Sequence, residues 1–185
     1  CGSSMIILDV LYDRQKRRSV YHRIMVAFSS FAIINSVSMV ITTVPVPADT
    51  GVVFAIGNEA SCDFQGFLMQ MGGSACFVYN ATLTIYFVQV IRFKKNETQT
   101  KRWELLYHIP PICMGVGTAT AALIMGWLGF SDLWCWIHTA DPHSYLIRTW
   151  AFWYGPCWLC FLTVLVGMSI ILRYVYVTEQ DSAKH

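Results

Sequence analysis

Charged side chains are scarce in this chain of 185 residues. Asp, Glu, Lys and Arg make up 13% of it, whereas soluble domains average about 25%. Hydrophobic residues make up 55%, and the net charge is +2. This balance excludes an intrinsically disordered chain and a basic nucleic-acid-binding protein. The composition therefore favours an integral membrane protein whose main surroundings are a lipid bilayer.

Sequence motifs of enzymes are missing as well. The chain contains no Gly-rich phosphate loop, no HExxH and no GxSxG pattern. The pair Cys157 and Cys160 lacks a companion His or Cys pair, which favours helix packing over a metal site. No acid lies inside an apolar run, as an ion path would require, and no half of the chain is repeated. We therefore expect no catalytic group, cofactor or metal, and we disfavour a transporter or channel.

Long uncharged runs are what the sequence does contain. A helix needs about 20 apolar residues to cross a bilayer, and four runs reach that length. A shorter apolar stretch at the N-terminus is expected to be the inner end of a further helix. The predicted fold is all-α, a polytopic transmembrane helix bundle, with membrane segments at residues 1–12 (partial), 24–48, 64–91, 105–130 and 149–172. Pro156 should kink the last segment, because proline removes a helical hydrogen bond.

The basic residues indicate the orientation of the bundle. Ten of the thirteen Lys and Arg residues lie in the connections 13–23 and 92–104, which the positive-inside rule places in the cytoplasm. The connections 46–63 and 131–147 contain no Lys or Arg, and we expect them outside, together with the N-terminus. Five acids lie in these outer connections: Asp49, Glu59, Asp63, Asp132 and Asp141.

Two of the seven cysteines, Cys62 and Cys135, fall in the outward-facing regions. The outer compartment is oxidising, so we expect these two to form a disulfide. Aromatic residues gather around the same outer ends. They fit either an interfacial belt or the wall of an extracellular ligand pocket, and the two interpretations are compatible. The members are Trp127, Trp134, Trp136, Trp150, Trp153, Tyr154 and Trp158.

These features resemble helices one to five of a seven-helix G protein-coupled receptor. The similarity rests on a Cys at the outer start of the third helix, a second Cys within Trp134-Cys-Trp-Ile137, and two basic inner loops. The run from Cys62 to Gln70 (CDFQGFLMQ) and the polar run Tyr79-Asn-Ala-Thr82 resemble the third helix of the slime-mould cyclic AMP receptor-like group. The Cys-Trp-Ile of the outer loop is similar in that group and in secretin and adhesion receptors. Residues 91–95 read IRFKK, without the Asp-Arg-Tyr triplet of rhodopsin-like receptors.

The resemblance implies a receptor that binds an extracellular small molecule and signals to a heterotrimeric G protein. The acid-bearing outer loops and the disulfide fit a plasma membrane. Such a fold needs about 250 residues for its spans and loops, so we expect this sequence to hold a partial seven-helix fold. The ligand would face Gln65, Phe67, Gln70, Trp134 and Trp136. The G protein or the anionic inner leaflet would face Arg17, Arg18, Arg92, Lys94 and Lys95.

Two alternatives remain open from the sequence. Positive-inside placement alone explains the five bases that the resemblance assigns to the G protein. A structural or accessory subunit of a larger membrane complex would also need no more than a short-looped, charge-poor chain.

Overall fold

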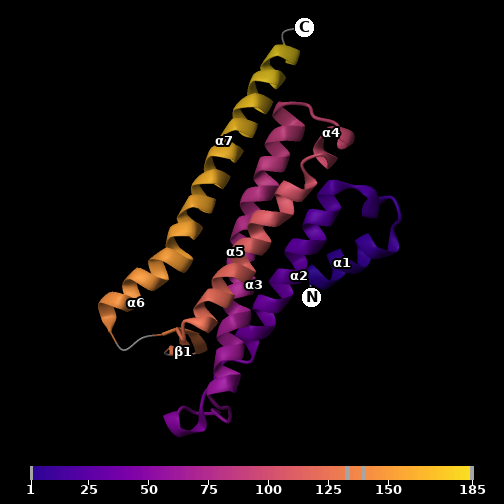
Figure 1. Ribbon diagram of the computed structural model, residues 1–185. Coiled ribbons are helices and arrows are strands. Elements are labelled where there is room, and N and C mark those ends of the chain that lie inside the picture. Colours follow the sequence, from indigo (N-terminus) through magenta and orange to yellow (C-terminus); the bar gives the residue numbers. More distant parts are fainter. Residues whose placement is uncertain (1, 132–133, 139–140, 184–185) are drawn as a thin grey trace.

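The computed structural model describes residues 2–131, 134–138 and 141–183, and these form a bundle of long helices (Figure 1). The expected all-α membrane bundle is confirmed, with one small hairpin added. Four short segments are 3-10 helices (η1, η2) or π-helices (η3, η4). In chain order the elements are α1 (Gly2–Tyr12), η1 (Lys16–Arg18), α2 (Val20–Val40), η2 (Ala48–Thr50), α3 (Glu59–Phe87), η3 (Val88–Arg92), α4 (Glu97–Lys101), α5 (Glu104–Ile124), β1 (Leu128–Ser131), β2 (Trp134–Ile137), α6 (Pro142–Thr149), η4 (Trp150–Tyr154) and α7 (Gly155–Ala183).

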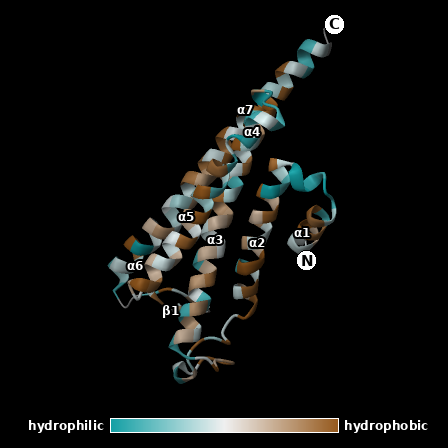
Figure 2. Cartoon of the chain, turned by 45° about the vertical axis from the view of Figure 1, so that its right-hand side comes forward, coloured by the Kyte–Doolittle hydropathy of each residue, from teal (hydrophilic) through white to brown (hydrophobic). Residues whose placement is uncertain are grey.

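Three helical stretches are long and apolar enough to cross a membrane: Val20–Val40, Glu59–Arg92 and Pro142–Ser182. Polar residues gather at both ends of the bundle, while the middle is largely apolar (Figure 2). The fourth expected span corresponds to α5, whose 21 residues include Tyr107, His108 and two prolines that lower its hydropathy. We keep α5 as a proposed span, because α3 covers one of its faces along the bundle. The partial segment 1–12 is the helix α1, packed against α2; Cys1 and Asp132 lie outside the described residues.

Two uncharged runs extend beyond the helices that they contain. The run 24–48 is helical only to Val40, after which Thr42 takes a left-handed conformation (φ 38°) and two prolines follow. The run 105–130 is helical to Ile124, where Gly126 (φ 61°) turns the chain into β1. Both ends reflect backbone geometry that a helix cannot continue. Hydropathy alone measures apolar length and does not report these stops.

Helix α3 is the centre of the bundle and packs against α2, α5 and α7. Its face towards α2 and α5 joins an aromatic and aliphatic core that includes Val20, Ile24, Tyr79 and Tyr107. Small residues allow the close approach of neighbouring helices, as expected inside membranes. A Cβ atom at Gly115 would lie 2.7 Å from the carbonyl oxygen of Met71 on α3. The uncharged run 64–91 forms most of α3, and this stretch is the most buried of the three long apolar stretches.

The last helix changes its hydrogen-bonding pattern just before Pro156. Residues Trp150–Tyr154 form the π-helical segment η4, which joins α6 to α7. A local π segment accommodates a proline that donates no N–H. Figure 1 shows the bend between α6 and α7 at this place, as the sequence predicts.

Candidate functional site

A disulfide fastens the outer hairpin to the central helix. The sulfur atoms of Cys62 and Cys135 are bonded, with their Cα atoms 5.2 Å apart, so the expected pairing is confirmed. Strands β1 and β2 are antiparallel, and Cys135 lies opposite Phe130. Both cysteines are buried with Val46. The hairpin, which sequence analysis treated as a loop, is thus held against the outer end of α3.

Gln65 is fully buried and ties three segments together. Its Nε2 donates to the carbonyl oxygens of Ser38 (2.9 Å) and Thr42 (2.8 Å), beside the end of α2. Its Oε1 accepts the backbone N–H of Cys135 at 3.1 Å. Both amide hydrogens and one acceptor site are therefore occupied within the protein. In this arrangement Gln65 positions the hairpin and presents no surface to a ligand.

Gln70, one turn and a half further along α3, is also fully buried. Its Oε1 accepts the indole N–H of Trp136 at 2.9 Å. Its Nε2 lies within hydrogen-bond distance of three acceptors on α3, α5 and η4: Ser74 Oγ (3.0 Å), Thr118 Oγ1 (3.1 Å) and the carbonyl oxygen of Phe152 (3.1 Å). One amide thus joins the hairpin to three helical segments.

The contact between Gln70 and Phe152 has a cause in the sequence. Pro156 lacks an N–H, so the carbonyl of Phe152, four residues earlier, loses its usual helical donor. Gln70 supplies a donor in its place. A polar group left unpaired in a membrane would be costly. The buried glutamine of α3 therefore pairs with a carbonyl group that the proline kink between α6 and α7 leaves without its usual donor.

Aromatic rings surround this amide. The rings of Trp136 and Trp153 meet edge to face with centroids 5.1 Å apart, and Trp153 meets Phe77 in the same way at 4.9 Å. A Cβ atom at Gly73 would lie 2.3 Å from the Trp153 ring. The indole fits here because glycine has no side chain. Nearby, the guanidinium of Arg148 lies 4.5 Å from the centre of the Trp127 ring.

The structure brings together some of the predicted ligand residues. Gln70 and Trp136 are in direct contact, and Gln65 holds the strand that carries Trp136. Phe67 and Trp134 are half-buried. A hollow of about 320 Å³ beside the disulfide is lined instead by other residues, including Glu59, Asp63 and Phe130. The five residues remain a predicted ligand set, of which two are enclosed.

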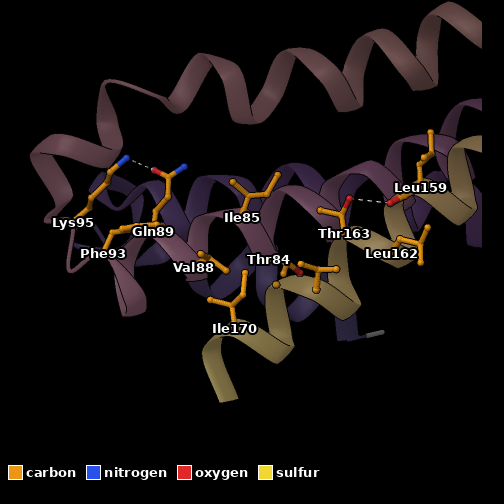
Figure 3. A pocket seen from close by; sticks show the side chains of 12 residues that line it. Thr84, Ile85, Val88, Gln89, Phe93, Lys95, Leu159, Leu162, Thr163 and Ile170 are labelled. Carbon is orange, nitrogen blue, oxygen red and sulfur yellow. Dashed lines mark hydrogen bonds between the residues drawn. The ribbon is translucent and has the colours of Figure 1, made fainter. Parts of the chain in front are cut away.

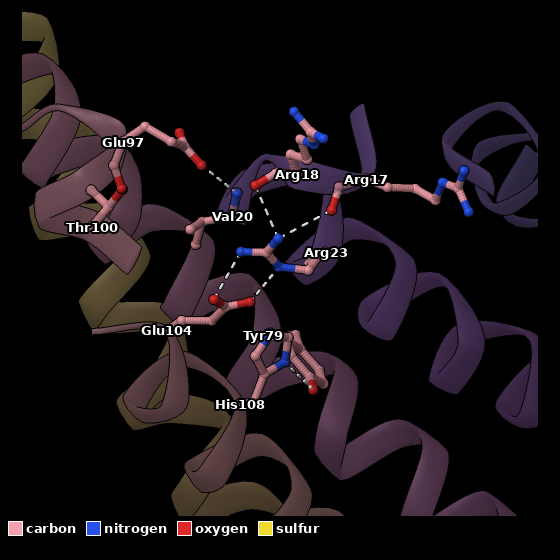
Figure 4. A network of polar contacts seen from close by, with 9 residues as sticks. All are labelled: Arg17, Arg18, Val20, Arg23, Tyr79, Glu97, Thr100, Glu104 and His108. Carbon is pink, nitrogen blue, oxygen red and sulfur yellow. Dashed lines mark hydrogen bonds and ion pairs between the residues drawn. The ribbon is translucent and has the colours of Figure 1, made fainter. Parts of the chain in front are cut away.

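The inner ends of the helices carry a second polar network (Figure 4). Arg23 on α2 forms a two-pronged ion pair with Glu104 on α5, in which Nη2 lies 2.8 Å from Oε2. The Nη1 group of Arg23 also donates to the carbonyl oxygens of Arg17 (3.1 Å) and Arg18 (2.9 Å). Glu97 accepts the backbone N–H of Val20 at 2.6 Å. The network fastens the two inner connections to each other.

Sequence reasoning missed this network, although a signal was present. Glu97 and Glu104 are the two acids in an inner connection that is otherwise basic. An acid there has basic partners within reach. Close to this network, the Nδ1 atom of His108 lies 3.2 Å from the hydroxyl of Tyr79 in the bundle.

The five bases predicted to face a G protein lie at this inner end. Arg17, Arg18, Arg92 and Lys94 are exposed, and Lys95 is half-buried. Figure 4 shows the side chains of Arg17 and Arg18 pointing away from the Arg23 network. Lys16, by contrast, is paired with Asp9 at 2.7 Å, and this hydrogen bond raises the pKa of Lys16. The exposed bases can therefore meet an anionic surface.

An apolar groove of about 720 Å³ runs between α3 and α7 (Figure 3). Lys95 and Gln89 lie at one end of it, and Leu159 lies towards the other. The Nζ of Lys95 donates to Oε1 of Gln89 at 3.0 Å. A smaller hollow of about 310 Å³, lined in part by Asn80 and Cys160, continues along the same seam. No feature of the sequence pattern pointed to this groove.

The family model described as slime mold cyclic AMP receptor matches residues 2–185. No curated protein matches the chain.

Proposed function

Because the chain belongs to the slime mold cyclic AMP receptor family, we propose that it binds an extracellular small molecule and signals to a cytoplasmic heterotrimeric G protein. It is a receptor-like membrane protein. We also propose that the protein lies in the plasma membrane, with its N-terminus outside. The observation that carries the proposal is the hydrogen bond between Trp136 and Gln70, since it joins an outer hairpin to the centre of the bundle.

The outer end offers a route from ligand binding to helix movement. A ligand that contacts Trp134, Trp136 or Phe67 at their half-buried surfaces would move the hairpin or hold it. Gln70 would transmit the change, because it contacts α5 and η4 at the same time. Gln65 would act as a positioning residue, since its amide is already satisfied. Such a ligand shifts the conformation only by as much as it prefers one state.

The inner end offers a surface for a G protein. Helix α3 leads directly into Arg92, Lys94 and Lys95, and η1 presents Arg17 and Arg18. Clustered bases steer association with an acidic partner surface. The ion pair of Arg23 with Glu104 holds the two basic connections in register, so movement of α3 relative to α5 would change the surface they present.

The test uses the protein in its native membranes, with purified heterotrimeric G protein and cyclic AMP as the probe. Stimulated nucleotide exchange on the G protein is the readout. Trp136→Phe keeps an aromatic ring at this position and removes the N–H that Gln70 accepts, so we expect the half-maximal concentration to rise by about tenfold, the effect of roughly 1.4 kcal/mol. Trp158→Phe is the matched control, because Trp158 lies on α7 with 55% of its surface exposed.

Two results would count against the proposal. Nucleotide exchange that does not respond to the probe, in a protein that binds it, would remove the coupling step. An unresponsive protein that co-purifies in fixed ratio with other membrane subunits would favour the accessory-subunit alternative.

A further inference from the structure

The groove between α3 and α7 has an apolar body. Its walls are mostly aliphatic, and Leu159, Leu162 and Val166 on α7 each expose half or more of their surface. The hydroxyl groups inside it are already bonded to their own helices: Thr84 donates to the carbonyl of Asn80, and Thr163 to that of Leu159. The walls therefore favour contact with a hydrocarbon chain and provide few free polar groups for a polar ligand.

Basic residues gather at the inner end of this groove. Lys95 lines the groove itself, and its ammonium has three donors, of which Gln89 accepts one. Ile170 also borders a second hollow of about 380 Å³, which is lined by Arg92 and Arg173. The Arg92 guanidinium lies 5.2 Å from the centre of the Tyr174 ring, a contact that holds the cation over the seam.

The length of the groove matches half a membrane. Its lining on α7 runs from Leu159 to Ile170, a distance of about 16 Å along a helix that rises 1.5 Å per residue. The hydrocarbon core of a bilayer is about 30 Å thick, so the groove corresponds to one leaflet. Its volume of about 720 Å³ lies within the range of about 300–1,000 Å³ found for small-molecule sites.

We propose that this groove binds an anionic phospholipid of the inner leaflet. An acyl chain lies along the aliphatic walls of α3 and α7, and the phosphate lies among Lys95, Arg92 and Arg173. The site requires both parts, because basic pockets between transmembrane helices favour anionic headgroups while the walls exclude charge. The bound lipid would add contacts between α7 and α3 along the groove. This inference is independent of the identity of the extracellular ligand.

The test is native mass spectrometry of the intact chain in detergent, titrated with equal amounts of dioleoyl phosphatidylserine and dioleoyl phosphatidylcholine. We expect a preference for phosphatidylserine of roughly a hundredfold, since the three bases each contribute about fivefold. The variant in which Lys95, Arg92 and Arg173 are all changed to Gln should lose the preference. Ile170→Trp, which fills the place where the two hollows meet, should weaken binding of both lipids.

A matched control removes the same charge elsewhere. Arg14, Lys101 and Arg102 lie in the two basic connections but line neither hollow, and their joint change to Gln should leave the preference intact. An equal loss in this control would overturn the proposal, because the effect would then be one of net charge. Absence of any preference in the unaltered protein would also overturn it.

A second copy of the chain is the competing occupant. A docked helix would also cover the neighbouring hollow at Cys160, a residue that does not line the groove. A dimer in the mass spectrum that excludes lipid and dissociates in Cys160→Trp would therefore refute the lipid assignment. Retention of the disulfide, measured by thiol labelling, shows in each variant that the outer fold is preserved.

Discussion

Replacing Gln70 with leucine tests whether one buried amide holds the outer ends of three helices together. Leucine has a similar volume and removes every polar contact of the side chain. Two groups then lose the partner that Gln70 supplies: the indole N–H of Trp136 and the carbonyl oxygen of Phe152. Ser74 and Thr118 lose less, since Thr118 also donates to the carbonyl of Met114 at 2.6 Å.

The cost follows from these two groups. A buried polar group left unpaired costs about 1–3 kcal/mol, whereas hydrogen bonds between helices of a membrane protein average about 0.6 kcal/mol. Taking roughly 1–2 kcal/mol for each group, between these two measures, we expect the free energy of unfolding to fall by about 2–4 kcal/mol. Denaturant titration in bicelles, followed by tryptophan fluorescence, measures it.

Gln180→Leu is the matched control for this measurement. Gln180 makes one side-chain contact, with the Tyr176 hydroxyl, on an exposed part of α7, so its loss should change the free energy of unfolding by less than about 0.5 kcal/mol. If Gln70→Leu were as mild as this control, the outer ends would not depend on the amide, and the proposed transmission through Gln70 would lose its basis.

Three further substitutions test other contacts. Cys62→Ser should lower the free energy of unfolding by about 2–4 kcal/mol, and a reducing agent should then have no added effect on thermal unfolding. Gly73→Ala should cost about 1–3 kcal/mol through overpacking against an indole ring, whereas Gly117→Ala, with no heavy atom within 4 Å of its new Cβ, should be neutral; equal effects would contradict the packing argument. Arg23→Gln should destabilise by about 1–3 kcal/mol, because it leaves a partly buried carboxylate unpaired, and adding Glu104→Gln should restore part of the loss; strictly additive costs in a double-mutant cycle would rule out the pairing.

The sequence predicted the disulfide, but it did not predict the hydrogen-bond partners of the two buried glutamines. The pairing of Cys62 with Cys135 followed from the predicted topology, which places these two cysteines in an oxidising compartment. The family resemblance assigned Gln65 and Gln70 to a ligand, and that role stays a prediction. Three-dimensional contacts decide their partners: backbone atoms of Ser38 and Cys135 for one, and Trp136 for the other. A hydropathy profile does not show which carbonyl groups lack a helical donor at a helix end or before a proline.

Composition and the order of apolar runs determined, without any coordinates, that this chain is an all-α membrane bundle, because a bilayer forces backbone groups to pair within helices. The tertiary structure decided what those helices hold: the hairpin under the disulfide, the Arg23 to Glu104 pair and the groove beside α7. Each joins residues more than 60 positions apart in the chain. Packing between helices brings these distant residues together, and no local pattern along the sequence predicts which of them meet.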